Sequence, residues 1–104
     1  MSSRTTPRPV TRALKDIGDD IRTWRLLQRL TAEQVADRAG VNVKTVSSLE
    51  NGHGANLESS LRVLRALGLL DRLSQALDPY ESDVGRLRAD EALPERIRHS
   101  SGRV

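Results

Sequence analysis

Residues 31–52, TAEQVADRAGVNVKTVSSLENG, hold the pattern that decides the fold. Thr31 is followed three residues later by Gln34, a spacing typical of the capping box that starts a helix. The inward side of this short helix is supplied by small apolar residues, Val35, Ala36 and Ala39. Gly40 ends the helix, because glycine readily adopts the left-handed conformation found at helix C-termini. We therefore expect one short helix followed by a tight turn.

A second short helix is predicted after the turn, from Val43 to about Asn51. Asn42 can cap its start, and Val46 and Leu49 are spaced to face inward. Its outward side is polar and consists of Lys44, Thr45, Ser47 and Ser48. Two short helices joined by a glycine turn are typical of a helix-turn-helix, whose second helix can lie in the major groove of DNA.

Helical patterns continue on both sides of this unit. Before it, apolar residues three or four positions apart predict a helix with a single buried stripe: Leu14, Ile17, Ile21, Trp24, Leu27 and Leu30. After it, Asn56 can cap a fourth helix that stops at Gly68 and carries Leu57, Leu61, Leu64 and Leu67. A fifth helix is predicted to end at Asp78-Pro79 and carries Leu69, Leu70, Leu73 and Leu77.

The composition agrees with an all-α fold. Of the 104 residues, 37% are hydrophobic and none is Phe, so the core must be aliphatic, which disfavours a β-sandwich. We predict one five-helix domain over residues 14–78, between a disordered basic arm at residues 1–13 and a charged, mostly flexible tail at residues 79–104. Within the tail, the pattern supports at best a short helix around Val84 to Leu93.

The residue types present disfavour several classes of function. The chain has no Cys, so it lacks disulfides, thiolate metal sites and a Cys nucleophile, and it fits a reducing compartment such as the cytoplasm. His53 and His99 show no spacing typical of metal ligands, and no nucleophile-elbow motif is present. No run approaches the roughly 20 apolar residues of a membrane span. We therefore expect a cytoplasmic protein without a membrane segment, a metal or a cofactor, and not an enzyme.

Residues 31–52 resemble the helix-turn-helix of the Xre, or phage-repressor-like, superfamily, and the resemblance extends from Ile17 to Leu69. It implies a five-helix, repressor-like domain that binds double-stranded DNA, usually as a dimer. The expected function is that of a sequence-specific DNA-binding transcriptional regulator, a repressor that acts by occupying an operator.

The resemblance also implies contacts for individual residues. Base edges would be met by Val43, Lys44 and Ser47, while Thr45, Ser48, Asn51 and Arg22 would lie near bases or phosphates. Lys44 can donate to guanine O6 and N7, and the Ser47 hydroxyl suits any base. Val43 has two interpretations: it offers a methyl surface to thymine, or it holds the turn together by packing against Val46.

In this family an Arg of the first helix pairs with a Glu at the end of the reading helix, and these match Arg25 and Glu50. Such a pair would lock the reading helix to the scaffold; the alternative is two solvated surface charges. Many members place a phosphate-binding Gln at the start of the second helix, where this chain has Ala32. Phosphate contacts would then depend on the basic arm through Arg4, Arg8 and Arg12, unless the arm is merely solvated.

A dimer is predicted from the leucines of the fifth helix. Leu69, Leu70 and Leu73, together with Leu77 and Val63, are more apolar residues than one last helix needs to close a small core. Some of them would then face a second copy of the chain in a homodimer. The alternative is that all of them lie in the core of one domain.

The tail carries a second resemblance, to a different class of protein. Residues 78–98, DPYESDVGRLRADEALPERIR, resemble the C-terminal segment of HipB-like antitoxins, which accompany HipA-like kinase toxins. The alternative function is therefore an antitoxin of a type II toxin-antitoxin pair that neutralises such a kinase and autoregulates its operon. The spaced apolar anchors for this partner would be Tyr80, Val84, Leu87, Leu93 and Ile97. A plain solvated tail is the other interpretation.

Overall fold

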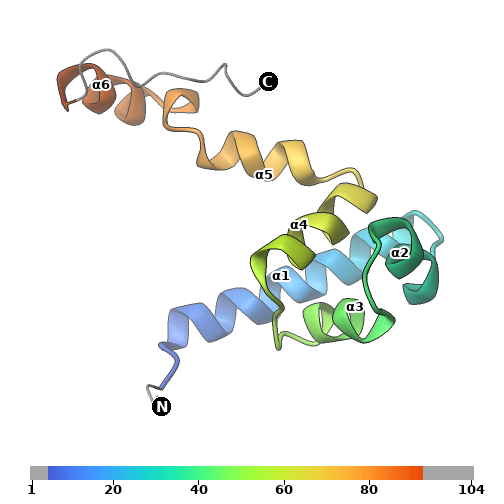
Figure 1. Ribbon diagram of the computed structural model, residues 1–104. Coiled ribbons are helices and arrows are strands. Elements are labelled where there is room, and N and C mark those ends of the chain that lie inside the picture. The colour runs from blue at the N-terminus through green and yellow to red at the C-terminus, as the bar shows by residue number, and fades with distance from the viewer. Residues whose placement is uncertain (1–4, 93–104) are drawn as a thin grey trace. The chain divides into compact units, whose positions relative to one another are not determined.

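The computed structural model describes residues 5–92, and all regular secondary structure in this range is helical (Figure 1). The elements are α1 (Arg8–Leu27), α2 (Ala32–Ala39), α3 (Val43–Glu50), α4 (Leu57–Ala66), α5 (Leu70–Leu77), the short 3-10 helix η1 (Pro79–Glu81) and α6 (Asp83–Ala92). The predicted all-α fold is confirmed, and α6 takes the place of the short helix expected in the tail.

The chain divides into two compact units, Met1–Leu70 and Asp71–Val104. The first contains α1 to α4 and the second contains η1 and α6, while α5 begins at the boundary between them. No helix among residues 5–92 is long and apolar enough to span a membrane.

The first helix begins earlier than its apolar pattern indicates. Pro7 is the N-cap of α1 and Pro9 lies in its first turn, where a missing amide hydrogen is no loss because no helical partner exists for it. The disordered arm predicted at residues 1–13 is therefore wrong from Arg8 onward, where the chain is helical. The residues of this stretch before Thr5 lie outside the part that the structure describes.

The buried stripe predicted along α1 is also wrong at two positions. Ile17 is 53% exposed and Leu27 is 67% exposed, whereas Ile21 is only 3% exposed. Arg29 adopts the left-handed conformation, with φ of 59°, so α1 ends at Leu27 and the chain turns there. Leu30 consequently reaches the core from the turn rather than from the helix.

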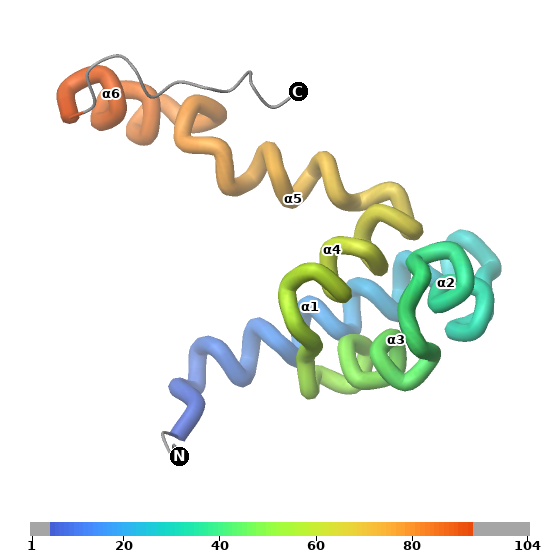
Figure 2. Tube along the Cα trace, in the orientation of Figure 1, coloured from blue at the N-terminus to red at the C-terminus, as the bar shows by residue number. Residues whose placement is uncertain are grey.

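The core of the first unit lies between four helices. Its most deeply buried side chains are Val35 of α2, Val46 of α3 and Val63 of α4, none of which exposes any surface. The remaining buried apolar residues pack around them: Ile21, Leu30, Ala36, Ala39, Leu49 and Leu67. α3 contacts α1, α2 and α4 and is thereby held by three neighbouring helices (Figure 2). An eight-residue helix is too short to be stable alone, so its orientation depends on these neighbours.

Gly18 sets how closely α1 approaches α3. It is buried, and a Cβ atom in its place would overlap the carbonyl oxygen of Leu49 and lie 2.9 Å from that of Glu50. The backbone of α1 therefore lies directly against the last carbonyl groups of α3. No larger residue fits unless one of the two helices moves.

Replacing Gly18 with Ala is expected to destabilise the protein. Helix propensity alone favours Ala by about 1 kcal/mol, but overpacking against backbone typically costs about 1–3 kcal/mol. We expect a net loss in the free energy of unfolding, measured by urea denaturation. Asp20→Ala, on the exposed side of the same helix, is the matched control and should be neutral or slightly stabilising. A Gly18→Ala variant as stable as this control would contradict the close approach.

Candidate nucleic-acid interface

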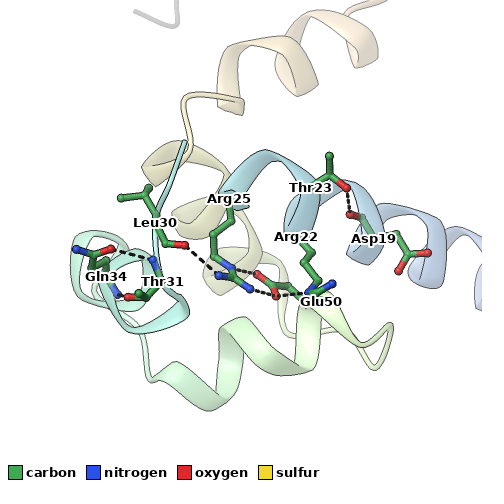
Figure 3. A network of polar contacts seen from close by, with 8 residues as sticks. All are labelled: Asp19, Arg22, Thr23, Arg25, Leu30, Thr31, Gln34 and Glu50. Carbon is green, nitrogen blue, oxygen red and sulfur yellow. Dashed lines mark hydrogen bonds and ion pairs between the residues drawn. The ribbon is translucent and has the colours of Figure 1, made fainter. Parts of the chain in front are cut away.

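Side chains cap the starts of α2 and α3, and a glycine ends α2 at the turn between them. The Thr31 hydroxyl accepts a hydrogen bond from the Gln34 amide at 3.0 Å, and the Gln34 side chain accepts one from the Thr31 amide at 2.8 Å (Figure 3). Gly40 adopts the left-handed conformation with φ of 73°. Asn42 then caps α3 by accepting from the Lys44 amide at 2.8 Å. The predicted capping box, turn glycine and second cap are confirmed.

The two sides of α3 differ as its pattern predicts. Val46 and Leu49 are buried in the core, and Lys44 and Ser47 are exposed on the side away from it. Lys44 takes part in no ion pair among residues 5–92. Its ammonium group and the Ser47 hydroxyl are therefore free to meet a ligand.

The residues predicted to lie near bases or phosphates differ in how far they are exposed. Thr45 and Ser48 are half-buried, and the Ser48 hydroxyl donates to the Gly54 carbonyl at 2.6 Å. This hydrogen bond ties α3 to the loop that follows it. Asn51 is exposed at the C-terminal end of α3. Among these polar residues, Ser48 is already engaged within the protein.

Val43 is half-buried and packs against the hydrophobic core. Of its two interpretations, this position favours packing within the turn. Ala32 likewise packs against the core, so the first position of α2 carries no side chain able to bind a phosphate.

Arg25 and Glu50 form a bidentate ion pair that joins α1 to the last residue of α3 (Figure 3). Arg25 Nε donates to Glu50 Oε2 at 2.6 Å and Nη2 donates to Oε1 at 2.9 Å. The third guanidinium nitrogen, Nη1, donates to the Leu30 carbonyl at 3.0 Å. One side chain thus holds α1, the α1–α2 turn and α3 together.

The pair is shielded from solvent, since the side chains of Arg25 and Glu50 are only 12% and 7% exposed. Hydrogen bonding to Glu50 raises the pKa of Arg25 above its ordinary value, against the opposing effect of burial. Arg22 lies at the edge of the pair, with its Nε 4.0 Å from Glu50 Oε1, and its side chain is 60% exposed. The geometry is therefore that of a structural ion pair with a second, solvated cation, Arg22, beside it.

The cations assigned to the arm fall into two groups. Arg8 and Arg12 lie on α1 and are exposed, so they belong to a helix rather than to a disordered segment. Arg4 lies outside the described residues.

The apolar residues assigned to a dimer interface are half-buried: Leu69, Leu70 and Leu73. Leu69 packs against the core of the first unit, and Leu77 is 74% exposed. Val63 exposes no surface, so it is not one of the residues of this set that could face a partner. It lies on the side of α4 that closes the core.

Within residues 5–92, no group of three or more His, Asp or Glu side chains is placed to hold a metal ion. His53 is exposed in the loop after α3, and His99 falls in the region that the structure leaves undescribed.

A family model of helix-turn-helix domains, HTH_3, matches residues 21–78, which is more than half of the chain. The chain belongs to this Xre-type helix-turn-helix family. A comparison with curated proteins gives no match. The Xre-type domain is a DNA-binding regulatory domain, and α2 and α3 are its helix-turn-helix. The protein is accordingly a DNA-binding transcription regulator of the Xre type.

Proposed function

We propose that this Xre-type protein is a sequence-specific repressor that occupies an operator with α3 in the major groove. The observation that carries the proposal is the contrast between the two sides of α3. Val46 is completely buried and Leu49 is 7% exposed, while Lys44 and Ser47 stand exposed on the opposite side. A short helix anchored by one side and polar on the other is suited to enter a groove.

The chemistry of the exposed side chains suits base edges. Lys44 can donate to O6 and N7 of guanine, and Ser47 can donate to or accept from any base. Each good base contact contributes about 1–3 kcal/mol of discrimination. The half-buried Val43 and Thr45 border this pair and would contribute apolar or hydroxyl contacts at its margin.

Phosphate contacts would lie around Lys44 and Ser47, the two side chains proposed to read bases. Arg22 and Asn51 lie at the C-terminal end of α3, where Arg22 is close to Glu50 and remains largely exposed. Because the first residues of a reading helix lie deepest in the groove, its other end lies near the bordering backbone. Arg22 and Asn51 would donate to phosphates there.

A homodimer would double this interface. Leu70 and Leu73 are half-buried and Leu77 is exposed, so α5 keeps apolar surface available for a second copy. A twofold dimer would place two reading helices about 34–36 Å apart, one DNA turn, and would select a nearly palindromic operator. Occupation of such a site would exclude RNA polymerase sterically.

The double substitution Lys44→Ala and Ser47→Ala is expected to remove sequence-specific binding without unfolding the protein. Loss of two base contacts should weaken operator binding by about 2–6 kcal/mol, at least roughly 30-fold. The operator would be selected from a library of random duplexes with the native protein, and affinity measured by fluorescence anisotropy. Arg65→Ala with Gln75→Ala, exposed on α4 and on the side of α5 away from its leucines, provides the control. Equal affinities for the two variants would refute α3 as the reading helix.

A second candidate function, an antitoxin, is favoured by the second unit. Val84 and Leu87 are 65% and 60% exposed on α6, and they lie three residues apart on one side of that helix. The segment itself is braced internally, since Arg86 donates to the Tyr80 carbonyl and pairs with Asp83 at 2.6 Å. A preformed helix with two exposed apolar anchors is suited to a protein partner such as a HipA-like kinase. Of the other three anchors assigned to this partner, Tyr80 is half-buried, and Leu93 and Ile97 fall beyond the described range.

Substitution of both anchors, Val84→Ser with Leu87→Ser, tests the antitoxin function. In cells expressing a HipA-like kinase, this variant should lose protection against growth arrest while retaining operator binding, because the helix-turn-helix is untouched. Arg88→Ser with Asp90→Ser, exposed on the same helix, should protect as well as the native protein. Full protection by the variant lacking both anchors would argue against α6 as the kinase-binding element.

A further inference from the structure

We propose that the N-terminal half of α1 carries a second DNA-binding surface, the basic edge formed by Arg8, Arg12 and Lys15, which binds the phosphate backbone beside the bases that α3 reads. The inference rests on the proposed function, since it places the edge next to a bound operator. It assigns a partner to a part of the chain that precedes the family match, which begins at residue 21.

The three cations share one edge of α1. They occupy positions i, i+4 and i+7, which lie one above the other on a helix, and all three are exposed. No ion pair among residues 5–92 engages any of them. The first carboxylate of α1 is Asp16, so residues 8–15 carry three positive charges and no negative one. This charge is not neutralised within the described chain.

The basic edge continues toward the end of the reading helix. A Cβ atom at Gly52, just after α3, would lie 3.1 Å from the Cα atom of Lys15, so the two backbones are in contact there. Two turns further along the same edge, Arg22 Nε lies 4.0 Å from Glu50, the last residue of α3. Beyond these contacts, the first turns of α1 extend past the other helices of this unit (Figure 1).

Because the basic edge lies beside the C-terminal end of α3, it would lie near the DNA backbone when α3 is in the major groove. With the start of α3 in the groove, its C-terminal end and Gly52 lie at the wall of the groove, where the phosphates are. Lys15 would meet this wall first, and Arg12 and Arg8 would follow it outward. Seven residues of helix span about 10.5 Å, and each DNA strand carries one phosphate per ~3.4 Å of duplex axis, so the basic edge is long enough to lie beside more than one phosphate. The length and the positive charge of the edge therefore suit a short stretch of DNA backbone.

The triple variant Arg8→Gln, Arg12→Gln and Lys15→Gln tests the proposal in the full-length protein. Affinity would be measured against salt concentration for the selected operator, both as a minimal duplex and with about ten extra base pairs on each side. Each lost phosphate contact lowers the slope of log affinity against log salt by about 0.9, so we expect a decrease of about 2.7 per protomer. The preference for operator over random duplex should not change, because backbone contacts carry no sequence information.

The control variant is Arg38→Gln, Arg65→Gln and Arg88→Gln, which removes the same charge from exposed positions on α2, α4 and α6. It should retain the native salt slope, and circular dichroism should show native helix content in both variants. A basic-edge variant with the native slope, or with the slope of the control, overturns the proposal while leaving the reading function of α3 intact. Failure of the native protein to select any sequence instead contradicts the proposed function, and the basic edge with it.

Discussion

The ion pair between Arg25 and Glu50 is the constraint on which the arrangement of this domain depends. α3 has only eight residues, too few to be stable by itself, so its orientation must come from its neighbours. Glu50 ends α3 and accepts two hydrogen bonds from Arg25, whose third donor reaches the Leu30 carbonyl. Because both charged groups are shielded from water, loss of either side chain would leave the other as a buried charge without a partner.

Backbone contact reinforces the same junction. Gly18 lets α1 lie against the carbonyl groups of Leu49 and Glu50, and Gly52 meets α1 at Lys15. The inward side of α3 is closed by Val46, which exposes no surface. With three kinds of contact fixing one side and one end of the helix, the opposite side can remain entirely polar. These contacts support α3 from behind and leave Lys44 and Ser47 exposed, as the proposed base-reading surface would need.

Features set by local chemistry could be predicted from the sequence, and features set by long-range packing could not. The capping box at Thr31 and the left-handed turn at Gly40 follow from a few neighbouring residues, and both are present. Exposure of Ile17 depends on where α3 lies against α1, and the stripe pattern alone placed it in the core. A glycine inside an amphipathic helical pattern was the available signal of close packing at position 18.

The start of α1 is a second place where the structure differs from what the sequence predicted. Composition at the N-terminus indicated disorder, whereas Pro9 is well suited to the first turn of a helix. The pairing of Arg25 with Glu50, by contrast, followed from the family resemblance and is present in the structure. Its third bond, to the Leu30 carbonyl, depends on the left-handed turn at Arg29 and has no signal in the sequence.

A double-mutant cycle on the free energy of unfolding tests this central constraint most directly, with Arg25→Met, Glu50→Met and both together, and with Arg22→Gln as the exposed control. Each single variant should lose about 3–5 kcal/mol because a buried charge is left without its partner, and the double variant should lose far less than the sum. Arg22→Gln should lose no more than about 1 kcal/mol. If each single variant lost as little free energy of unfolding as Arg22→Gln, and the two losses added up in the double variant, the pair would not be what holds α3 in place.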